Sequence, residues 1–191
     1  MAVFEGVVLD DARTIMARYP AEHQRSSIMP LLYLAQSVEG SVSPEALREI
    51  GGRLGITTAE VEAVASFYSM YRMRPTGEHV ISVCTNLACK LRGAEAVYEA
   101  AHEAAGVRHG QERSADGLFT VHEEECLGVC DYAPAVQVNV CNHDTVTPER
   151  IRELIAQLRD GAVPAPARGP AFPSFKAASR ALAGLEEVPA S

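Results

Sequence analysis

The first part of the chain places its hydrophobic residues at helical spacing. In residues 26–38 four apolar side chains recur at i, i+3, i+4 and i+7: Ile28, Leu31, Leu32 and Ala35. This stripe predicts an amphipathic helix. Pro30 falls inside the pattern, so it lies either in the first turn of this helix or at a kink in a longer helix that begins near Ala21.

Two more helix starts follow before residue 75. Ser43 followed by Pro44 is a typical cap, and Thr57 with Glu60 three residues later forms a capping box. The connections between these helices are short. Residues 1–75 are therefore predicted to form a small helical bundle.

Beyond residue 75 the pattern changes to alternating strands and helices. Strands are expected over residues 79–83, 118–122 and 135–140, with a turn at Asn142-His143-Asp144 leading into a short return strand. Helices are expected over residues 91–105 and from the Thr147-Pro148 cap to Gly161. The order β-α-β-β-β-α resembles that of a thioredoxin-like α/β sandwich, so we expect an α+β chain in which residues 76–160 form such a domain.

The pattern changes once more after Gly161. Four prolines fall close together: Pro164, Pro166, Pro170 and Pro173. Residues 161–191 are therefore expected to be a Pro-rich C-terminal tail that is largely extended, with Ser174 able to cap one short last helix.

Composition and charge narrow the classes of function. The 191 residues are 47% hydrophobic, which excludes a disordered or low-complexity chain. Seventeen basic against twenty-five acidic residues give a net charge of −8, which argues against nucleic acid as a partner. No signal-like N-terminus or membrane-length apolar run is seen, so we expect a cytoplasmic protein that is not inserted in a membrane.

The five cysteines carry the strongest chemical information. An odd number fits poorly with a closed set of disulfides. Cys84 and Cys89 are spaced C-x4-C, and Cys126 and Cys130 are spaced C-x3-C. Each pair follows a predicted strand, so both are expected on loops at one end of the sheet. A binuclear iron–sulfur cluster needs two thiolates for each iron, and the spacing favours it over structural zinc, which also accepts such pairs.

Longer motifs around these cysteines resemble a known family. CTNLACKLRGAE, EECLGVCDYAP and AVQVNV, preceded by SSIMPLLYLAQ and GITTAEVEAVASFYSMYRMRPTG, are similar to the thioredoxin-like [2Fe–2S] subunits of respiratory NADH:quinone oxidoreductase (complex I). The resemblance covers most of the chain from about residue 10 to about residue 160, but not the tail. It implies one [2Fe–2S] cluster bound by Cys84, Cys89, Cys126 and Cys130.

The same resemblance implies a function in electron transfer. The cluster would exchange single electrons with the flavin of an FMN- and NADH-binding flavoprotein subunit, beside a large iron–sulfur subunit, peripheral to the membrane. No catalytic residue is expected in this chain, which lacks the glycine-rich nucleotide motifs. Similar subunits serve NAD-reducing hydrogenases and NAD-dependent formate dehydrogenases. The alternative from a different class of function is a protein-interaction module that is held together by zinc (a zinc-stapled module) and has no redox role.

Several further residues carry weaker expectations. Cys141 has no counterpart in the family pattern and is interpreted as a spare thiol on a hairpin. Pro134 precedes a strand beside the second cysteine pair, where thioredoxin-like folds often carry a cis-proline, and its isomer stays open. His122 is expected to be an exposed strand-end residue or a hydrogen-bond donor near the cluster, and Glu123-Glu124-Glu125 a solvated face. Three aromatics at helical spacing are expected in the core: Phe67, Tyr68 and Tyr71.

Overall fold

The computed structural model describes residues 2–108 and 110–185. Two compact units make up this part of the chain. The first contains the residues up to Pro75 together with a segment that begins at Lys176, and the second contains Thr76–Phe175. The last six residues of the Pro-rich tail lie outside the described residues.

The first unit is helical. Its elements are α1 (Val7–Met16), the 3-10 helix η1 (Ala21–Ser27), α2 (Ile28–Glu39), α3 (Pro44–Leu54), α4 (Thr58–Phe67) and most of α8 (Phe175–Leu182). Helix α2 packs against α1, α3 and α4, and its Leu31, Leu32 and Leu34 are fully buried. Pro30 lies in the first turn of α2, where its missing N–H costs no helical hydrogen bond.

The expected helix caps are confirmed. The Ser43 hydroxyl accepts a hydrogen bond from the Ala46 backbone N–H at 3.1 Å, and α3 begins at Pro44. Thr57 and Glu60 form the capping box at the start of α4. These contacts satisfy N–H groups that the first helical turn leaves unpaired.

One of the three aromatic residues differs from expectation. Tyr71 is buried and Tyr68 packs against the same core, but Phe67 is 78% exposed. Phe67 is the last residue of α4 and lies two positions after the buried Ala65. Residues two apart point to different sides of a helix, so Phe67 faces away from the core.

The second unit is built on a four-stranded sheet with the order β2-β1-β3-β4. The strands are β1 (His79–Cys84), β2 (Phe119–Glu124), β3 (Val136–Val138) and β4 (Cys141–His143). Strand β1 runs parallel to β2 and antiparallel to β3, and β4 pairs antiparallel with β3. This mixed sheet, with its helices and the helical first unit, confirms the expected α+β class and thioredoxin-like fold.

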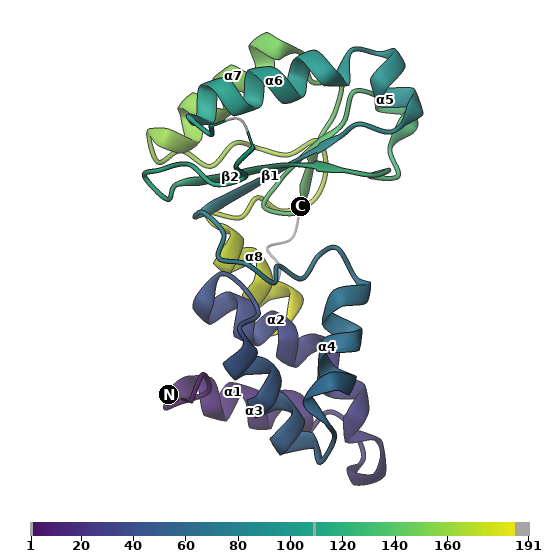
Figure 1. Ribbon diagram of the computed structural model, residues 1–191, viewed down its shortest axis with the longest axis vertical. Helices are drawn as coiled ribbons and strands as arrows, with labels where there is room; N and C mark the ends of the chain where they lie inside the picture. Colours follow the sequence, from purple (N-terminus) through teal and green to yellow (C-terminus); the bar gives the residue numbers. More distant parts are fainter. Residues whose placement is uncertain (1, 109, 186–191) are drawn as a thin grey trace. The chain divides into compact units, whose positions relative to one another are not determined.

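Helices cover one face of this sheet. After the short α5 (Leu87–Leu91), α6 (Ala94–Ala105) and α7 (Pro148–Arg159) lie side by side over the strands (Figure 1). Alternate strand residues point toward these helices, so Ile81, Val83 and Val121 join one buried cluster with Val97 and Leu154. None of the described helices is long and apolar enough to cross a membrane.

One local expectation in this unit is wrong, and another differs from the structure at its start. The turn expected at residues 142–144 instead falls at Asn139 and Val140, which have φ angles of 49° and 69°, so β4 starts at Cys141. The Asn139 side chain accepts a hydrogen bond from the Val80 backbone N–H at 3.0 Å, which holds the turn against β1. The helix expected over residues 91–105 is present as α6, but it begins at Ala94 because Gly93 has a φ of 93°.

The Pro-rich segment is extended but attached. The Ala167 N–H donates to the Asn142 carbonyl at 2.8 Å, within the second unit. Farther along, the Arg180 guanidinium lies 2.8 Å from Asp11, and Arg18 donates to the Ala183 carbonyl at 2.9 Å, both within the first unit. The described part of the tail therefore contributes to both units.

Candidate metal centre

The first cysteine pair lies at the end of β1 and in the helix that follows. Cys84 is the last residue of β1, and its N–H donates to the Ala135 carbonyl at 3.1 Å, next to the start of β3. The Asn86 side chain accepts from the Leu87 N–H at 2.7 Å and so begins α5, which carries Cys89. Both cysteines are only 2% exposed. This pair therefore forms the inner side of the site.

The second pair lies on the loop after β2. Cys126 follows the strand closely, and Cys130 begins the 3-10 helix η2 (Cys130–Tyr132). Gly128 has a φ of 75° and directs its N–H to the Cys126 sulfur at 3.4 Å. The Cys126 and Cys130 sulfurs are 3.4 Å apart, and both residues are exposed. Two thiolates on one tetrahedral metal with bonds of about 2.3 Å lie about 3.8 Å apart, so this pair is close to that arrangement.

The two pairs also influence each other. Burial, the contact with Cys84 and the charge of Cys130 together raise the pKa of the Cys89 thiol to about 11, and burial is the largest of these causes. The pKa of Cys130 is raised by the neighbouring Cys126, whereas the Gly128 N–H lowers the pKa of Cys126. A thiol with a raised pKa ionises readily only when a cation replaces its proton. The thiols of each pair are therefore close enough to affect one another's ionisation, and a metal cation could take the place of their protons.

Small apolar side chains surround the inner pair. Ala94, Ala133 and Ala135 are buried with Cys84 and Cys89, and Ala88, Leu127 and Val129 pack partly buried against them. The Ala133–Pro134 peptide, whose isomer the sequence left open, is cis. Such a lining keeps water from one side of a bound metal group, while the second cysteine pair stays open to solvent.

The chemistry of the four donors fits an iron–sulfur cluster. All five cysteines are free thiols, so no disulfide competes for them. The thiols approach each other as two pairs from two loops, which is the supply that two irons require. In the described part of the chain, no three or more His, Cys, Asp or Glu side chains are arranged to hold a metal ion as the side chains stand.

The fifth cysteine lies elsewhere. Cys141 is in β4, and β3 separates that strand from β1 in the sheet. Its thiol donates to the Pro170 carbonyl at 3.0 Å, and burial raises its pKa. Cys141 therefore contacts the C-terminal segment rather than the other four thiols.

The sequence-based expectations for the residues before Cys126 are partly wrong. His122 is not exposed: it is 7% accessible, and its Nε2 lies 3.0 Å from the Ser82 hydroxyl. Glu123 and Glu125 are exposed, as expected, but both accept hydrogen bonds from the first cysteine loop, from Thr85 and Asn86. Alternation along β2 places His122 on the sheet face away from α6, and the sequence did not show that this face is also covered.

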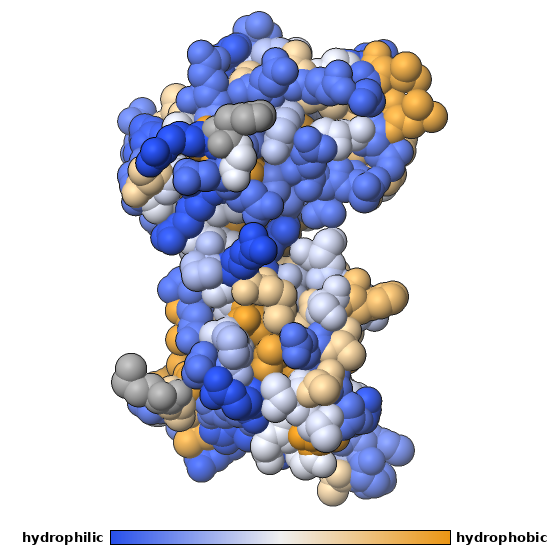
Figure 2. Space-filling view, viewed as in Figure 1, coloured by the Kyte–Doolittle hydropathy of each residue, from blue (hydrophilic) through white to orange (hydrophobic). Residues whose placement is uncertain are grey.

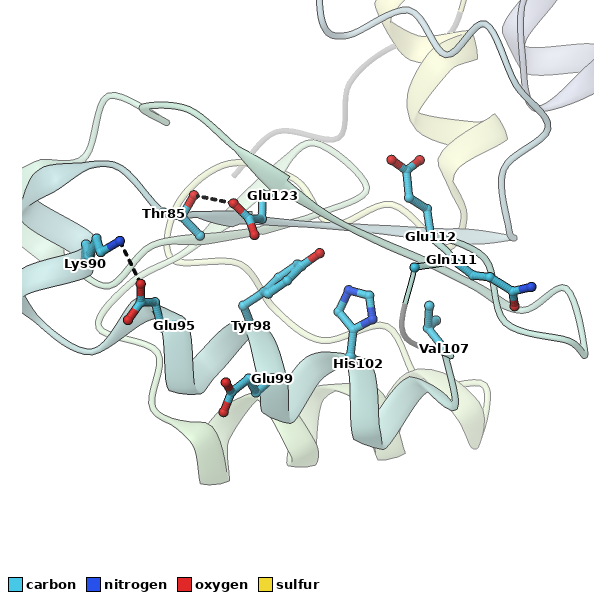
Figure 3. A pocket seen from close by; sticks show the side chains of 11 residues that line it. Thr85, Lys90, Glu95, Tyr98, Glu99, His102, Val107, Gln111, Glu112 and Glu123 are labelled. Carbon is cyan, nitrogen blue, oxygen red and sulfur yellow. Dashed lines mark hydrogen bonds and ion pairs between the residues drawn. The ribbon is translucent and has the colours of Figure 1, made fainter.

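A surface hollow lies beside the site, between α6 and the outer edge of β2 (Figure 3). It is polar and contains none of the cysteines. Residues that line it include Thr85, Lys90, Glu95, Tyr98 and Glu123. Two contacts that fix the first cysteine segment, Thr85 with Glu123 and Lys90 with Glu95, lie at its edge (Figure 3).

An apolar patch lies over α5, next to the inner cysteine pair (Figure 2). Leu87 and Leu91 are one helical turn apart and are 71% and 78% exposed. Exposed leucines next to a functional site are typical of a protein–protein contact.

Comparisons with known proteins agree with this geometry. The model of the thioredoxin-like [2Fe–2S] ferredoxin family matches residues 12–159. One subunit of the NADH-quinone oxidoreductase of Mycobacterium bovis is 46% identical over 177 residues, which are 93% of this chain and 69% of that protein. A subunit of the Thermus thermophilus NADH-quinone oxidoreductase is also 46% identical, over 76% of this chain and 80% of that protein.

A solved structure extends the comparison. The crystal structure of an NAD+-reducing [NiFe]-hydrogenase matches 70% of this chain with a TM-score of 0.61 and 26% identity. This chain covers only 23% of the hydrogenase chain, so the similarity concerns one part of that larger protein.

Proposed function

The chain belongs to the thioredoxin-like [2Fe–2S] ferredoxin family, and from that premise we propose that it is the electron-transfer subunit of an NADH:quinone oxidoreductase. In this proposal Cys84, Cys89, Cys126 and Cys130 bind the single [2Fe–2S] cluster of the family. The observation that supports this is that two neighbouring parallel strands each lead into a segment with two thiols, and that the Cys126 and Cys130 sulfurs lie 3.4 Å apart.

The two cysteine pairs would bind the [2Fe–2S] cluster from opposite sides. When bound, a [2Fe–2S] cluster supplies one-electron oxidation and reduction. Cys84 and Cys89 bind from the buried side, where the small alanines exclude water. Cys126 and Cys130 bind from the exposed side, and the Gly128 N–H stabilises negative charge on the Cys126 sulfur.

We further propose that the redox partner is the FMN- and NADH-binding flavoprotein subunit of the complex, with a large iron–sulfur subunit nearby. The exposed second cysteine pair and the leucines of α5 support a contact with another protein at this end of the unit. The chain would then be peripheral to the membrane through the larger complex and have no active site of its own. The hydrogenase similarity supports a second candidate, the equivalent subunit of an NAD-reducing hydrogenase.

Reconstitution tests the cluster directly. The full-length protein is incubated without oxygen with ferrous iron and sulfide, and its visible absorption and the electron paramagnetic resonance (EPR) spectrum of the reduced form are recorded. We expect two irons and two acid-labile sulfides per chain and an EPR signal that appears on reduction. A colourless protein that retains one zinc and no sulfide would contradict the proposal and favour the zinc-stapled module.

Purification with neighbouring subunits tests the assembly. A tag on the chain, expressed in its own organism, should recover a flavoprotein that contains FMN. Recovery of hydrogenase subunits instead would select the second candidate.

A further inference from the structure

The acidic run before the second cysteine pair is bonded to the loop of the first pair. The Thr85 N–H donates to the Glu124 carbonyl at 3.1 Å and continues the β1–β2 pairing beyond Cys84. The Thr85 hydroxyl donates to Glu123 at 3.1 Å, and the Asn86 amide donates to Glu125 at 3.0 Å. Three consecutive residues at the end of β2 and just after it thus accept hydrogen bonds from three donors of Thr85 and Asn86.

These hydrogen bonds join residues that are adjacent to the cysteines in the sequence. Thr85 and Asn86 connect Cys84 to the helix that carries Cys89, while Glu125 directly precedes Cys126. The Asn86 oxygen also accepts the Leu87 N–H that begins α5, so one side chain links Glu125 to the start of that helix. The two carboxylates therefore bond to the residues that lie between Cys84 and Cys89.

The bonds contribute more to geometry than to stability. All four side chains are at least partly exposed to water, and hydrogen bonds in that setting add little to folding free energy. Their effect is on geometry, because each hydrogen bond holds one side chain of the first cysteine segment at a set distance from the second, and no disulfide joins the two. If these carboxylates only faced solvent, hydrogen bonds to Thr85 and Asn86 would not be expected.

We propose that Glu123 and Glu125 are positioning residues that set the separation of the two thiol pairs. The proposal rests on the proposed function, because this separation matters only when all four thiols bind one cluster. The carboxylates act through contact with Thr85 and Asn86, so an uncharged acceptor of the same shape should replace them.

Three double variants of the full-length protein separate contact from charge. Glu123→Ala with Glu125→Ala removes both acceptors, whereas Glu123→Gln with Glu125→Gln keeps an amide oxygen at each position. Glu62→Ala with Glu99→Ala is the control, since it removes the same charge from exposed helical positions. For each protein we measure iron release to a chelator, the EPR line shape of the reduced form, and thermal unfolding of the metal-free form.

The alanine variant should release iron at least about tenfold faster, the scale found when outer residues of metal sites are replaced, and its EPR lines should broaden. The glutamine variant and the control should behave as the parent, and the metal-free forms should unfold alike. If the alanine variant fails to fold, Glu123→Ala and Glu125→Ala singly should each accelerate release.

Two results would overturn this inference while the proposed function stands. One is an alanine variant that releases iron at the parental rate. The other is a glutamine variant that matches the alanine variant, because charge rather than contact would then matter. A parent protein that forms no iron–sulfur spectrum would overturn the proposed function itself.

Discussion

The inner and outer cysteines should differ strongly in reactivity when the protein is free of metal. The perturbation is alkylation of the full-length protein with iodoacetamide below pH 9, and the two thiols compared are Cys89 and Cys126. The pKa of Cys89 is raised from 9.0 to about 11, mainly by burial. The pKa of Cys126 is lowered by the Gly128 N–H, and this thiol is exposed.

The magnitude follows from the fraction of thiolate. A rise of two pKa units leaves Cys89 with about a hundredfold less thiolate than an ordinary cysteine at any pH below 9. The greater nucleophilicity of a more basic thiolate returns about tenfold of this loss. Ionisation alone therefore makes Cys89 about tenfold slower than an ordinary cysteine, and its 2% exposure slows it further.

Peptide mapping by mass spectrometry measures the rate at each cysteine. We expect Cys126 to be modified first and Cys89 to lag by more than about tenfold. The difference should narrow as the pH rises toward 11, because Cys89 then ionises. Equal rates for the two thiols would refute the division into an inner and an outer pair.

Three further changes test the site and the fold. Cys126→Ser should abolish the iron–sulfur spectrum of the reconstituted protein and Cys141→Ser should leave it intact; loss of the spectrum in the second variant would contradict the assignment of four ligands. Gly128→Ala places a side chain at a φ of 75°, which costs about 1 kcal/mol and turns the N–H away from the Cys126 sulfur. The variant protein should therefore lose iron faster than the parent protein. An unchanged rate of iron loss would show that this N–H is unimportant. Gln36 is fully buried and forms hydrogen bonds with Met70, Arg72 and Ser179, so at about 1 kcal/mol per bond Gln36→Leu should lower the free energy of unfolding by about 3 kcal/mol. In the same denaturant titration, Gln157→Leu at an exposed position should change this free energy little. Equal stabilities of the two variants would contradict the role given to the Gln36 hydrogen bonds.

The features that the sequence predicted well depend on neighbouring residues. The caps at Ser43, Thr57 and Thr147 all form, because each uses a side chain and an N–H three residues apart. The stripe of α2 is likewise a local repeat, and its residues are buried. The cysteine spacing is local in the same way, because the members of each pair are five and four residues apart, and the assignment of all four as ligands stays a prediction.

The features that it missed depend on residues far away in the chain. Asn139 turns the chain because its side chain meets Val80, a partner 59 positions earlier. His122 is 7% accessible, and its Nε2 lies 3.0 Å from the hydroxyl of Ser82, a residue 40 positions earlier on the neighbouring strand. The bonds of Glu123 and Glu125 to the first cysteine loop span 38 and 39 positions. Spacing within a motif contains no information about such partners.

The difference between the cysteine pairs is the part of the site that bears most on function. Spacing alone treats the four thiols as equivalent, but Cys84 and Cys89 are enclosed and Cys126 and Cys130 are not. Enclosed thiols would limit the access of water and solutes to one side of a group bound to them. On the proposed function, we expect a redox partner to come nearest at the second pair. We expect the contact surface of the partner to include Cys126, Cys130 and the adjoining Tyr132, which is 48% exposed.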